Sequence, residues 1–200
     1  MHVHRFVTDA ADTAPMKWIV LFLLLVAVAI AAWLLLRASA PDSFVPKYKA
    51  ALRELPGSEI AIDSGLETFV EVYRDLARPD LAERVRELYA ETMYFSDTLV
   101  TFRDRGELSD YMNMTAARLK ASRVDVDQIL RDGRDTFVRW TMHYETGSID
   151  STSIGMSHLR FDENGRIVLH QDFWDSASGL YRHLPVIGPL MRRADALIHD

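Results

Sequence analysis

The hydrophobic and polar positions of this chain follow two different periods. Between residues 64 and 119 the apolar residues recur every three or four positions, which is the spacing of amphipathic helices. After Ser122 apolar and polar residues alternate, which predicts strands over 124–130, 136–146, 153–161 and 167–174. Helices followed by strands in series predict an α+β domain, with three helices packed on one face of a curved antiparallel sheet.

The predicted helices begin and end at sequence signals. The stretch from Ser64 to Glu67 has the form of a capping box and opens a first helix, which Pro79 ends. A second helix follows Asp80, a short strand spans 93–97, and a third helix spans about 107–119. This order places one short strand between the helices and the long run of strands.

The N-terminal region carries an uninterrupted apolar run of nineteen residues, from Trp18 to Leu36. At about 1.5 Å per residue, a helix of this length reaches across a hydrocarbon core of roughly 30 Å. A cleaved signal peptide is the alternative, because Ala38-Ser39-Ala40 resembles a cleavage site. The run is longer than the usual signal core of about 7–15 residues, and Pro41 follows the site, so a retained transmembrane helix in the lipid bilayer is favoured.

These patterns divide the chain into four parts. We expect an N-terminal tail over 1–17, a transmembrane helix over 18–36, a juxtamembrane linker over 37–63 whose one regular element is a short helix around 48–55, and a globular domain over 64–200. Two basic residues precede the apolar run and four follow it closely. This bias favours a cytoplasmic domain on a single-pass protein of a bacterial inner membrane, although so short a tail can sit on either side.

Composition narrows the classes of function. The chain has no cysteine, which excludes disulfides, thiol nucleophiles and thiolate metal sites. Residues 38–200 carry 20 basic and 27 acidic side chains, and an acidic domain argues against nucleic acid, whose binding depends on clustered positive charge. The sequence contains neither a serine nucleophile elbow nor a phosphate-cradling glycine loop. We therefore expect no cofactor and no metal ion.

The last predicted strand, 167–174, concentrates candidate chemistry. Its alternation places His170, Asp172 and Trp174 on one face. The His170 imidazole and the Asp172 carboxylate are two residues apart and come within contact distance, so the carboxylate can orient the ring as in an acid–base pair. The alternative is an ion pair that closes the mouth of the domain.

Three short sequence segments point to a known superfamily. They are Leu88-Tyr89-Ala90-Glu91, the stretch from His158 to Val168, and Asp172-Phe173-Trp174-Asp175. With the order of elements over residues 66–193, they resemble the SnoaL-like/ketosteroid-isomerase superfamily, whose cone-shaped fold is shared with nuclear transport factor 2. The stretch from Leu180 to Met191 is similar to a bacterial subgroup of unassigned function.

The resemblance implies roles for individual residues. In the isomerase an aspartate at the end of the first strand is the general base, and Asp97 occupies that place. A first-helix tyrosine donates to the developing oxyanion there, and Tyr73 is its nearest match. Ser157 stands where the isomerase has a protonated aspartate as the second donor, which disfavours ketosteroid isomerisation itself. The family's pocket-facing positions fall on the same face of the last strand that alternation selects.

We expect the cone to bind a small, largely apolar molecule. The predicted ligand-binding residues are Phe95, Trp140, Ser157, Leu159 and Trp174. Desolvation by such a lining would raise the pKa of Asp97 toward a range in which it accepts and returns a proton. The alternative for Asp97 is a solvated aspartate in a turn.

Three functional hypotheses follow. The first is a membrane-anchored module that binds its ligand without turnover. The second is an acid/base enzyme (an isomerase, dehydratase or cyclase) that acts on a lipophilic substrate, with Asp97 as base and His170 and Asp172 as proton shuttle. The third is a scaffold whose cone is filled by side chains and whose sheet face forms a homodimer. The apolar tail after Asp175 would cap the cone, join a dimer or rest on a lipid surface.

Overall fold

The computed structural model describes residues 14–36 and 43–199, which fall into two compact units divided after residue 42. In the first unit the apolar run forms helix α1 (Ala14–Leu36). Within the described ranges, however, no helix is long and apolar enough to cross a membrane. The predicted transmembrane helix is therefore not supported, and the predicted signal-cleavage site lies outside the described residues.

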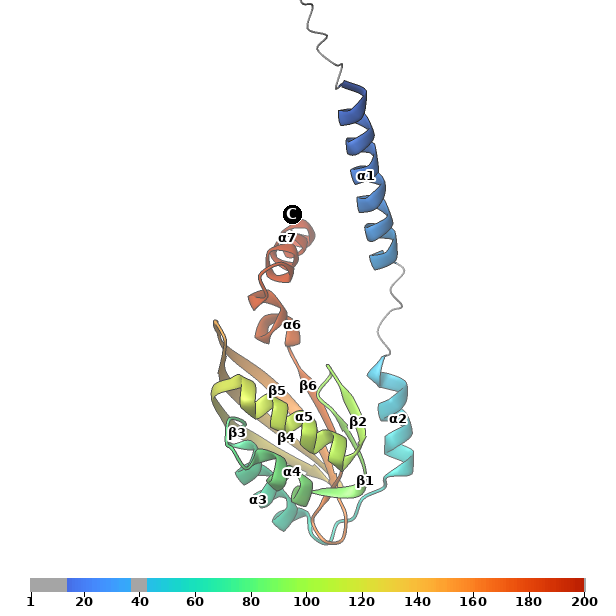
Figure 1. Ribbon diagram of the computed structural model, residues 1–200. Helices are drawn as coiled ribbons and strands as arrows, with labels where there is room; N and C mark the ends of the chain where they lie inside the picture. Colours follow the sequence, from blue (N-terminus) through green and yellow to red (C-terminus); the bar gives the residue numbers. More distant parts are fainter. Residues whose placement is uncertain (1–13, 37–42, 200) are drawn as a thin grey trace, which may run out of the picture. The chain divides into compact units, whose positions relative to one another are not determined.

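The second unit is built on a curved six-stranded sheet (Figure 1). The strands are β1 (Tyr89–Ser96), β2 (Thr101–Asp104), β3 (Leu119–Asp132), β4 (Asp135–Thr146), β5 (Ile149–Phe161) and β6 (Ile167–Trp174). They lie in the order β2-β1-β6-β5-β4-β3, and every neighbouring pair is antiparallel except β1 and β6. The prediction of a purely antiparallel sheet was wrong, because the chain returns through α5 and three hairpins to place β6 beside β1 in the same direction.

Three helices cover one face of this sheet, as predicted: α3 (Ile62–Tyr73), α4 (Leu81–Leu88) and α5 (Arg105–Arg118) (Figure 1). Their apolar stripes, including Phe69, Val85 and Leu108, form the larger hydrophobic core with the inner side of the strands. The expected capping box is absent. Helix α3 begins two residues before Ser64, whose hydroxyl donates backward to the Ala61 carbonyl at 3.1 Å.

On the opposite face of the sheet, α2 (Phe44–Glu54) covers β1 and β6. It lies in the segment predicted to be a linker, where the short helix expected around 48–55 is longer and part of the folded domain. Ala51 and Leu55 pack there against Tyr94 and Leu169, which form a second hydrophobic cluster. The prolines that suggested a tether are compatible with the helix because one lies in its first turn and the next follows its end. The folded unit therefore includes residues well before position 64.

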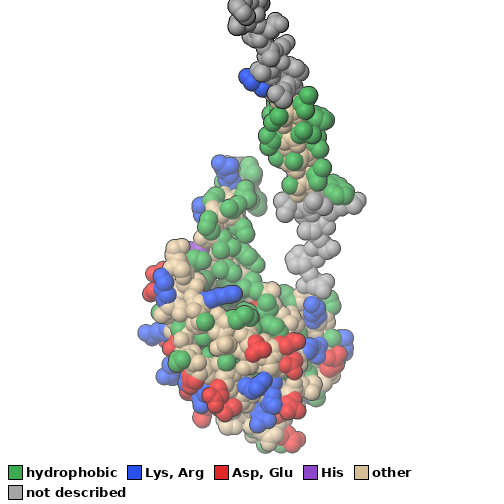
Figure 2. Space-filling view, in the orientation of Figure 1, with side chains coloured by type: hydrophobic (Ala, Val, Ile, Leu, Met, Phe, Trp, Pro, Cys, Tyr) green, Lys and Arg blue, Asp and Glu red, His purple; other side chains and the backbone are tan. Residues whose placement is uncertain are grey.

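The chain after β6 first returns to the sheet and then leaves it. In α6 (Ser176–Gly179) the carbonyl of Gly179 accepts hydrogen bonds from the Tyr144 hydroxyl at 2.5 Å and the Ser151 hydroxyl at 2.9 Å. A short 3-10 helix, η1 (Tyr181–His183), leads to α7 (Ile187–His199), which extends away from the sheet (Figure 1). The start of the tail therefore caps the cone, while α7 presents hydrophobic side chains on its surface (Figure 2).

Candidate functional site

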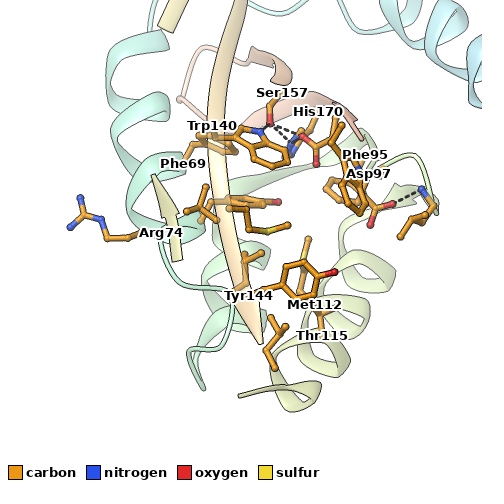
Figure 3. Close-up of a pocket in the computed structure, with 18 of the residues that line it drawn as sticks. Phe69, Arg74, Phe95, Asp97, Met112, Thr115, Trp140, Tyr144, Ser157 and His170 are labelled. Atoms are coloured by element: carbon orange, nitrogen blue, oxygen red, sulfur yellow. Dashed lines mark hydrogen bonds and ion pairs between the residues drawn. The ribbon is translucent and has the colours of Figure 1, made fainter. Parts of the chain in front are cut away.

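The space between the sheet and helices α3 and α5 is a cavity of about 230 Å³ (Figure 3). Leu180 of the tail closes part of it. Apolar groups make up most of the lining, and the aromatic members are Phe69, Tyr73, Phe95, Tyr111, Trp140, Tyr144 and Trp174. The interior of the cone is therefore hollow, which argues against a scaffold whose side chains fill it.

Strand β6 divides its side chains between the cavity and α2, as its alternation predicts. The Phe173 ring packs against Tyr48 of α2, with the ring centroids 5.7 Å apart. His170, Asp172 and Trp174 all line the cavity on the other side. The structure thus brings this row of polar and aromatic side chains to the predicted face.

A hydrogen-bonded cluster surrounds Asp172. Its Oδ1 lies 2.8 Å from His170 Nε2 and accepts a hydrogen bond from the Ser157 hydroxyl at 2.6 Å. The indole N–H of Trp140 in turn donates to Ser157 Oγ at 3.0 Å. Ser157 therefore connects the cavity wall to the carboxylate, and its hydroxyl is used as a donor within the protein.

The cluster continues on the far side of the His170 ring. His170 Nδ1 lies 2.5 Å from the Tyr89 hydroxyl, which lies 2.6 Å from the hydroxyl of Tyr73. Burial raises the pKa of both tyrosines well above the ordinary value, so both are neutral phenols. One arrangement of protons satisfies the whole row: Tyr73 donates to Tyr89, Tyr89 donates to Nδ1, and Nε2–H donates to Asp172.

Asp97 follows β1 and lies on the cavity wall. Its Oδ2 accepts a hydrogen bond from the Tyr111 hydroxyl at 2.7 Å, and its Oδ1 accepts from the backbone N–H groups of Leu99 and Val100, both at 2.9 Å. The indole N–H of Trp174 donates to the Asp97 carbonyl at 2.7 Å. The carboxylate is thus held in a fixed orientation by the turn after β1 and by Tyr111, and it is only partly exposed to solvent.

The turn that holds Asp97 has a strained backbone, and its surroundings shift the pKa of the Asp97 carboxyl group. The next residue, Thr98, has a φ of 73°, a left-handed conformation that strains a β-branched side chain. Desolvation raises the pKa of Asp97, the negative charge of Asp172 adds to the rise, and the Tyr111 hydrogen bond opposes it. A strained turn therefore holds a carboxyl group that takes up a proton more readily than an ordinary aspartate.

Comparison with known proteins decides the family. The model of the SnoaL-like domain matches residues 68–170, about half of the chain. The chain belongs to the SnoaL-like domain family. No curated protein matches its sequence.

Solved structures of low sequence identity share the fold of this SnoaL-like chain. An epoxide hydrolase of Mycobacterium tuberculosis, described as similar to LEH, aligns with a TM-score of 0.51 at 17% identity, over 70% of this chain and 96% of that one. A putative SnoaL-like polyketide cyclase of Shewanella denitrificans aligns with a TM-score of 0.50 at 13% identity, over 57% and 92%. A ketosteroid-isomerase-like protein of Catenulispora acidiphila, solved with trimethylamine, gives 0.50 at 16%, over 56% and 88%.

The predicted site residues of the SnoaL-like domain fall into two groups. Those that line the cavity are Tyr73, Phe95, Asp97, Trp140, Ser157, His170, Asp172 and Trp174. Leu159 is not part of the lining: its side chain is fully buried in the larger hydrophobic core, so the structure does not place it where a ligand in the cavity would contact it. The catalytic roles assigned to Asp97, His170, Asp172 and Tyr73 stay predictions.

Two side chains of the candidate site are not among the predicted site residues. Tyr111 and Tyr89 stand at apolar positions of the helical spacing, a pattern that indicates packing in the core. Their hydroxyl groups contact Asp97 and His170 respectively. A phenol within an apolar stripe is a signal for such a role, because a buried hydroxyl needs a hydrogen-bond partner.

Among the described residues, no cluster of potential ligands has the geometry of a metal site.

A second polar cluster lies on the opposite face of the sheet, beneath α2. His158 Nδ1 lies 2.7 Å from the Tyr48 hydroxyl, and its Nε2 lies 2.6 Å from Asp135 Oδ1. The Arg160 guanidinium donates to both oxygens of Asp135, at 2.5 and 3.2 Å, and to the Leu52 carbonyl of α2 at 2.8 Å. The sheet separates this cluster from the cavity, and the cluster attaches α2 to the outer face of the sheet.

Proposed function

We propose that this SnoaL-like domain binds a small, largely apolar molecule inside its cone. The single observation that carries the proposal is the hollow interior: a cavity of about 230 Å³ with an apolar and aromatic lining and a few ordered polar groups on one wall. This combination is the usual form of a small-molecule site, since the apolar lining supplies affinity and the polar groups fix orientation.

Native mass spectrometry of the purified full-length chain tests this proposal. We expect an additional mass that is lost on denaturation, from a small molecule that co-purifies with the protein. The variant Val126→Phe adds a ring to the cavity wall and should lose the adduct. Ile129→Phe, an exposed position of the same strand, adds the same kind of bulk outside the cavity and should retain it.

If Val126→Phe and Ile129→Phe retain the same adduct, the molecule binds elsewhere and the proposal is wrong. If the unsubstituted chain carries no adduct, a titration with a soluble aromatic probe decides whether the cavity accepts a ligand. The change in tryptophan fluorescence, to which Trp140 and Trp174 of the lining contribute, is the signal. Absence of binding in that titration would also contradict the proposal.

A second function, acid/base catalysis, is favoured by Asp97. Its carboxyl lies on the cavity wall with a raised pKa and an orientation fixed by Tyr111. The row of His170 and Asp172 lines the same cavity. An isomerase, a dehydratase or a cyclase requires a base that accepts a proton from the bound molecule. It also requires a group that returns a proton, and the hydrogen-bonded row can do so.

Hydrogen exchange of the co-purified molecule separates binding from catalysis. When the complex is incubated in D₂O, a catalytic base should introduce deuterium at a carbon of the bound molecule, which mass spectrometry detects. Asp97→Asn should abolish this exchange in the fraction of the variant that still carries the molecule. A complex that binds the molecule but exchanges no carbon-bound hydrogen, in the presence of Asp97, would exclude the proton-transfer enzymes and leave binding as the function.

A further inference from the structure

Asp97 has no cationic partner among the described residues, although it lies on the wall of an apolar cavity. Its three hydrogen-bond donors are the Tyr111 hydroxyl and two backbone N–H groups, all of them neutral. Asp172 lines the same cavity, and its donors are the hydroxyl of Ser157 and the ring nitrogen of His170. Two carboxyl groups therefore share one small cavity, and carboxylates so placed disfavour each other's charge.

The cavity lining offers little positive charge of its own. Among its described residues, Arg74 is the one lysine or arginine, and its side chain is exposed. In the close-up of the cavity its guanidinium points away from the other labelled side chains (Figure 3). A buried carboxylate is stabilised when an opposite charge comes within about 4–6 Å, and the protein's own lining does not place Arg74 to supply it.

The aromatic walls add a second requirement for the ligand. Phe95, Tyr111, Trp140 and Trp174 line the cavity together with the two carboxyl groups. The face of an aromatic ring attracts a cation, most strongly when the cation is removed from water. Aromatic faces and carboxylates together recognise an ammonium group, whereas a purely apolar molecule would leave Asp97 with its neutral donors alone.

We propose that the molecule bound in the cone is an amphipathic amine, with its ammonium group beside Asp97 and Asp172 and its apolar body against the aromatic walls. This inference rests on the proposed function, because it names the class of the ligand in the same cavity. An amine satisfies the carboxyl groups and buries its hydrocarbon part in one binding event.

Binding of two matched probes tests the proposal. Benzylamine is cationic at neutral pH, and benzyl alcohol has nearly the same size and shape without the charge. Each is titrated into the full-length chain, and the change in tryptophan fluorescence is followed, to which the cavity residues Trp140 and Trp174 contribute. We expect benzylamine to bind at least roughly tenfold more tightly than the alcohol, which is the magnitude of one well-placed charge interaction.

Two aspartate variants locate the effect. Asp97→Asn should weaken benzylamine roughly tenfold and leave benzyl alcohol nearly unchanged. Asp110→Asn makes the same change of charge at an exposed position of α5, beside Tyr111 and outside the lining, and should leave both affinities unchanged. Binding of the alcohol by Asp97→Asn also shows that this variant is folded.

The outcomes separate an amine ligand from a cavity that binds apolar molecules in general. Tighter binding of the amine that depends on Asp97 supports the inference. Equal binding of the two probes, or a preference that Asp110→Asn removes as well, overturns the inference and leaves the proposed function intact. If neither probe binds and no molecule co-purifies, the proposed function is wrong and the inference falls with it.

Discussion

The two faces of the sheet carry the same three side chains in the same arrangement, in opposite surroundings. On the inner face His170 lies between the hydroxyl of Tyr89 and the carboxyl of Asp172. On the outer face His158 lies between the hydroxyl of Tyr48 and the carboxyl of Asp135. In both clusters tyrosine contacts Nδ1 and aspartate contacts Nε2, so the triad by itself does not define a function.

The difference lies in what completes each cluster. Outside, the Arg160 guanidinium neutralises Asp135 and fastens the carbonyl of Leu52, so charge and hydrogen bonds are satisfied within the protein beneath α2. Inside, Asp172 lines a cavity, and Asp97 stands on the same wall with neutral donors. A cluster completed by its own cation stabilises the fold, whereas one that opens on a cavity is available to a ligand.

Removal of the Arg160 guanidinium from the outer cluster should cause the largest loss of stability. Arg160→Met leaves Asp135 without its guanidinium and two carbonyls of the α2 segment without a donor, so we expect a loss of about 3 kcal/mol in the free energy of unfolding. Urea denaturation of the full-length chain measures it. Arg123→Met, which breaks an exposed pair with Asp125, is the control and should change stability by less than about 1 kcal/mol. Equal losses would mean that the outer cluster does not stabilise the fold.

The same substitution on both faces sharpens the comparison. Asp135→Asn leaves the nearly buried Arg160 facing a neutral amide, and we expect a loss of about 2 kcal/mol because Asp135 is itself partly exposed. Asp172→Asn keeps an oxygen that accepts from Ser157 and His170, so its expected loss is below about 1 kcal/mol. Denaturant midpoints of the two variants provide the test. A larger loss at Asp172 would reverse the assignment of structural and functional roles.

The sequence predicts which face each side chain of β6 takes, but it does not predict depth or partners. Alternation places His170 and Asp172 correctly, because the period of a strand is a local property. Leu159 and Ser157 share a face by the same rule, yet Leu159 lies in the core, since distance along the cone depends on how the sheet curves. Tyr89 reaches His170 only through the parallel pairing of β1 and β6, which no local period encodes.

The outer layer shows the same limit. Residues Tyr48, Ala51 and Leu55 repeat at helical spacing and pack on the sheet, yet the surrounding prolines favoured a linker. The prolines do not prevent this helix, because they lie at the ends of α2, where proline is tolerated. The partner that makes the helix stable, the outer side of β1 and β6, is distant in sequence.

The pH dependence of stability should have opposite signs on the two faces. Desolvation lowers the pKa of His158 in the folded state, so the unfolded chain binds more protons just below the ordinary histidine value of about 6.5. Stability contributed by the outer cluster is therefore present above this pH and declines as the pH falls through it. Thermal melting between pH 7 and pH 5 should show a decline that His158→Gln reduces. A decline of the same size in the variant would contradict this origin.

The inner face should respond in the other direction, through Asp97. Its raised pKa means that the folded state binds more protons than the unfolded chain at pH values just above the ordinary aspartate value. Stability therefore falls as the pH rises through that window, and keeping Asp97 ionised near neutral pH destabilises the fold.

Asp97→Asn removes the charge and retains an oxygen for the N–H groups of Leu99 and Val100. We expect the variant to be more stable than the unsubstituted chain at pH 7, by up to about 1 kcal/mol, as is common where a functional group is held against stability. Melting temperatures at pH 4 and pH 7 measure the effect, which should shrink at the lower pH because Asp97 then carries less charge. A variant that is less stable at pH 7 would show that the carboxylate belongs, like Asp135, to the supporting structure of the domain.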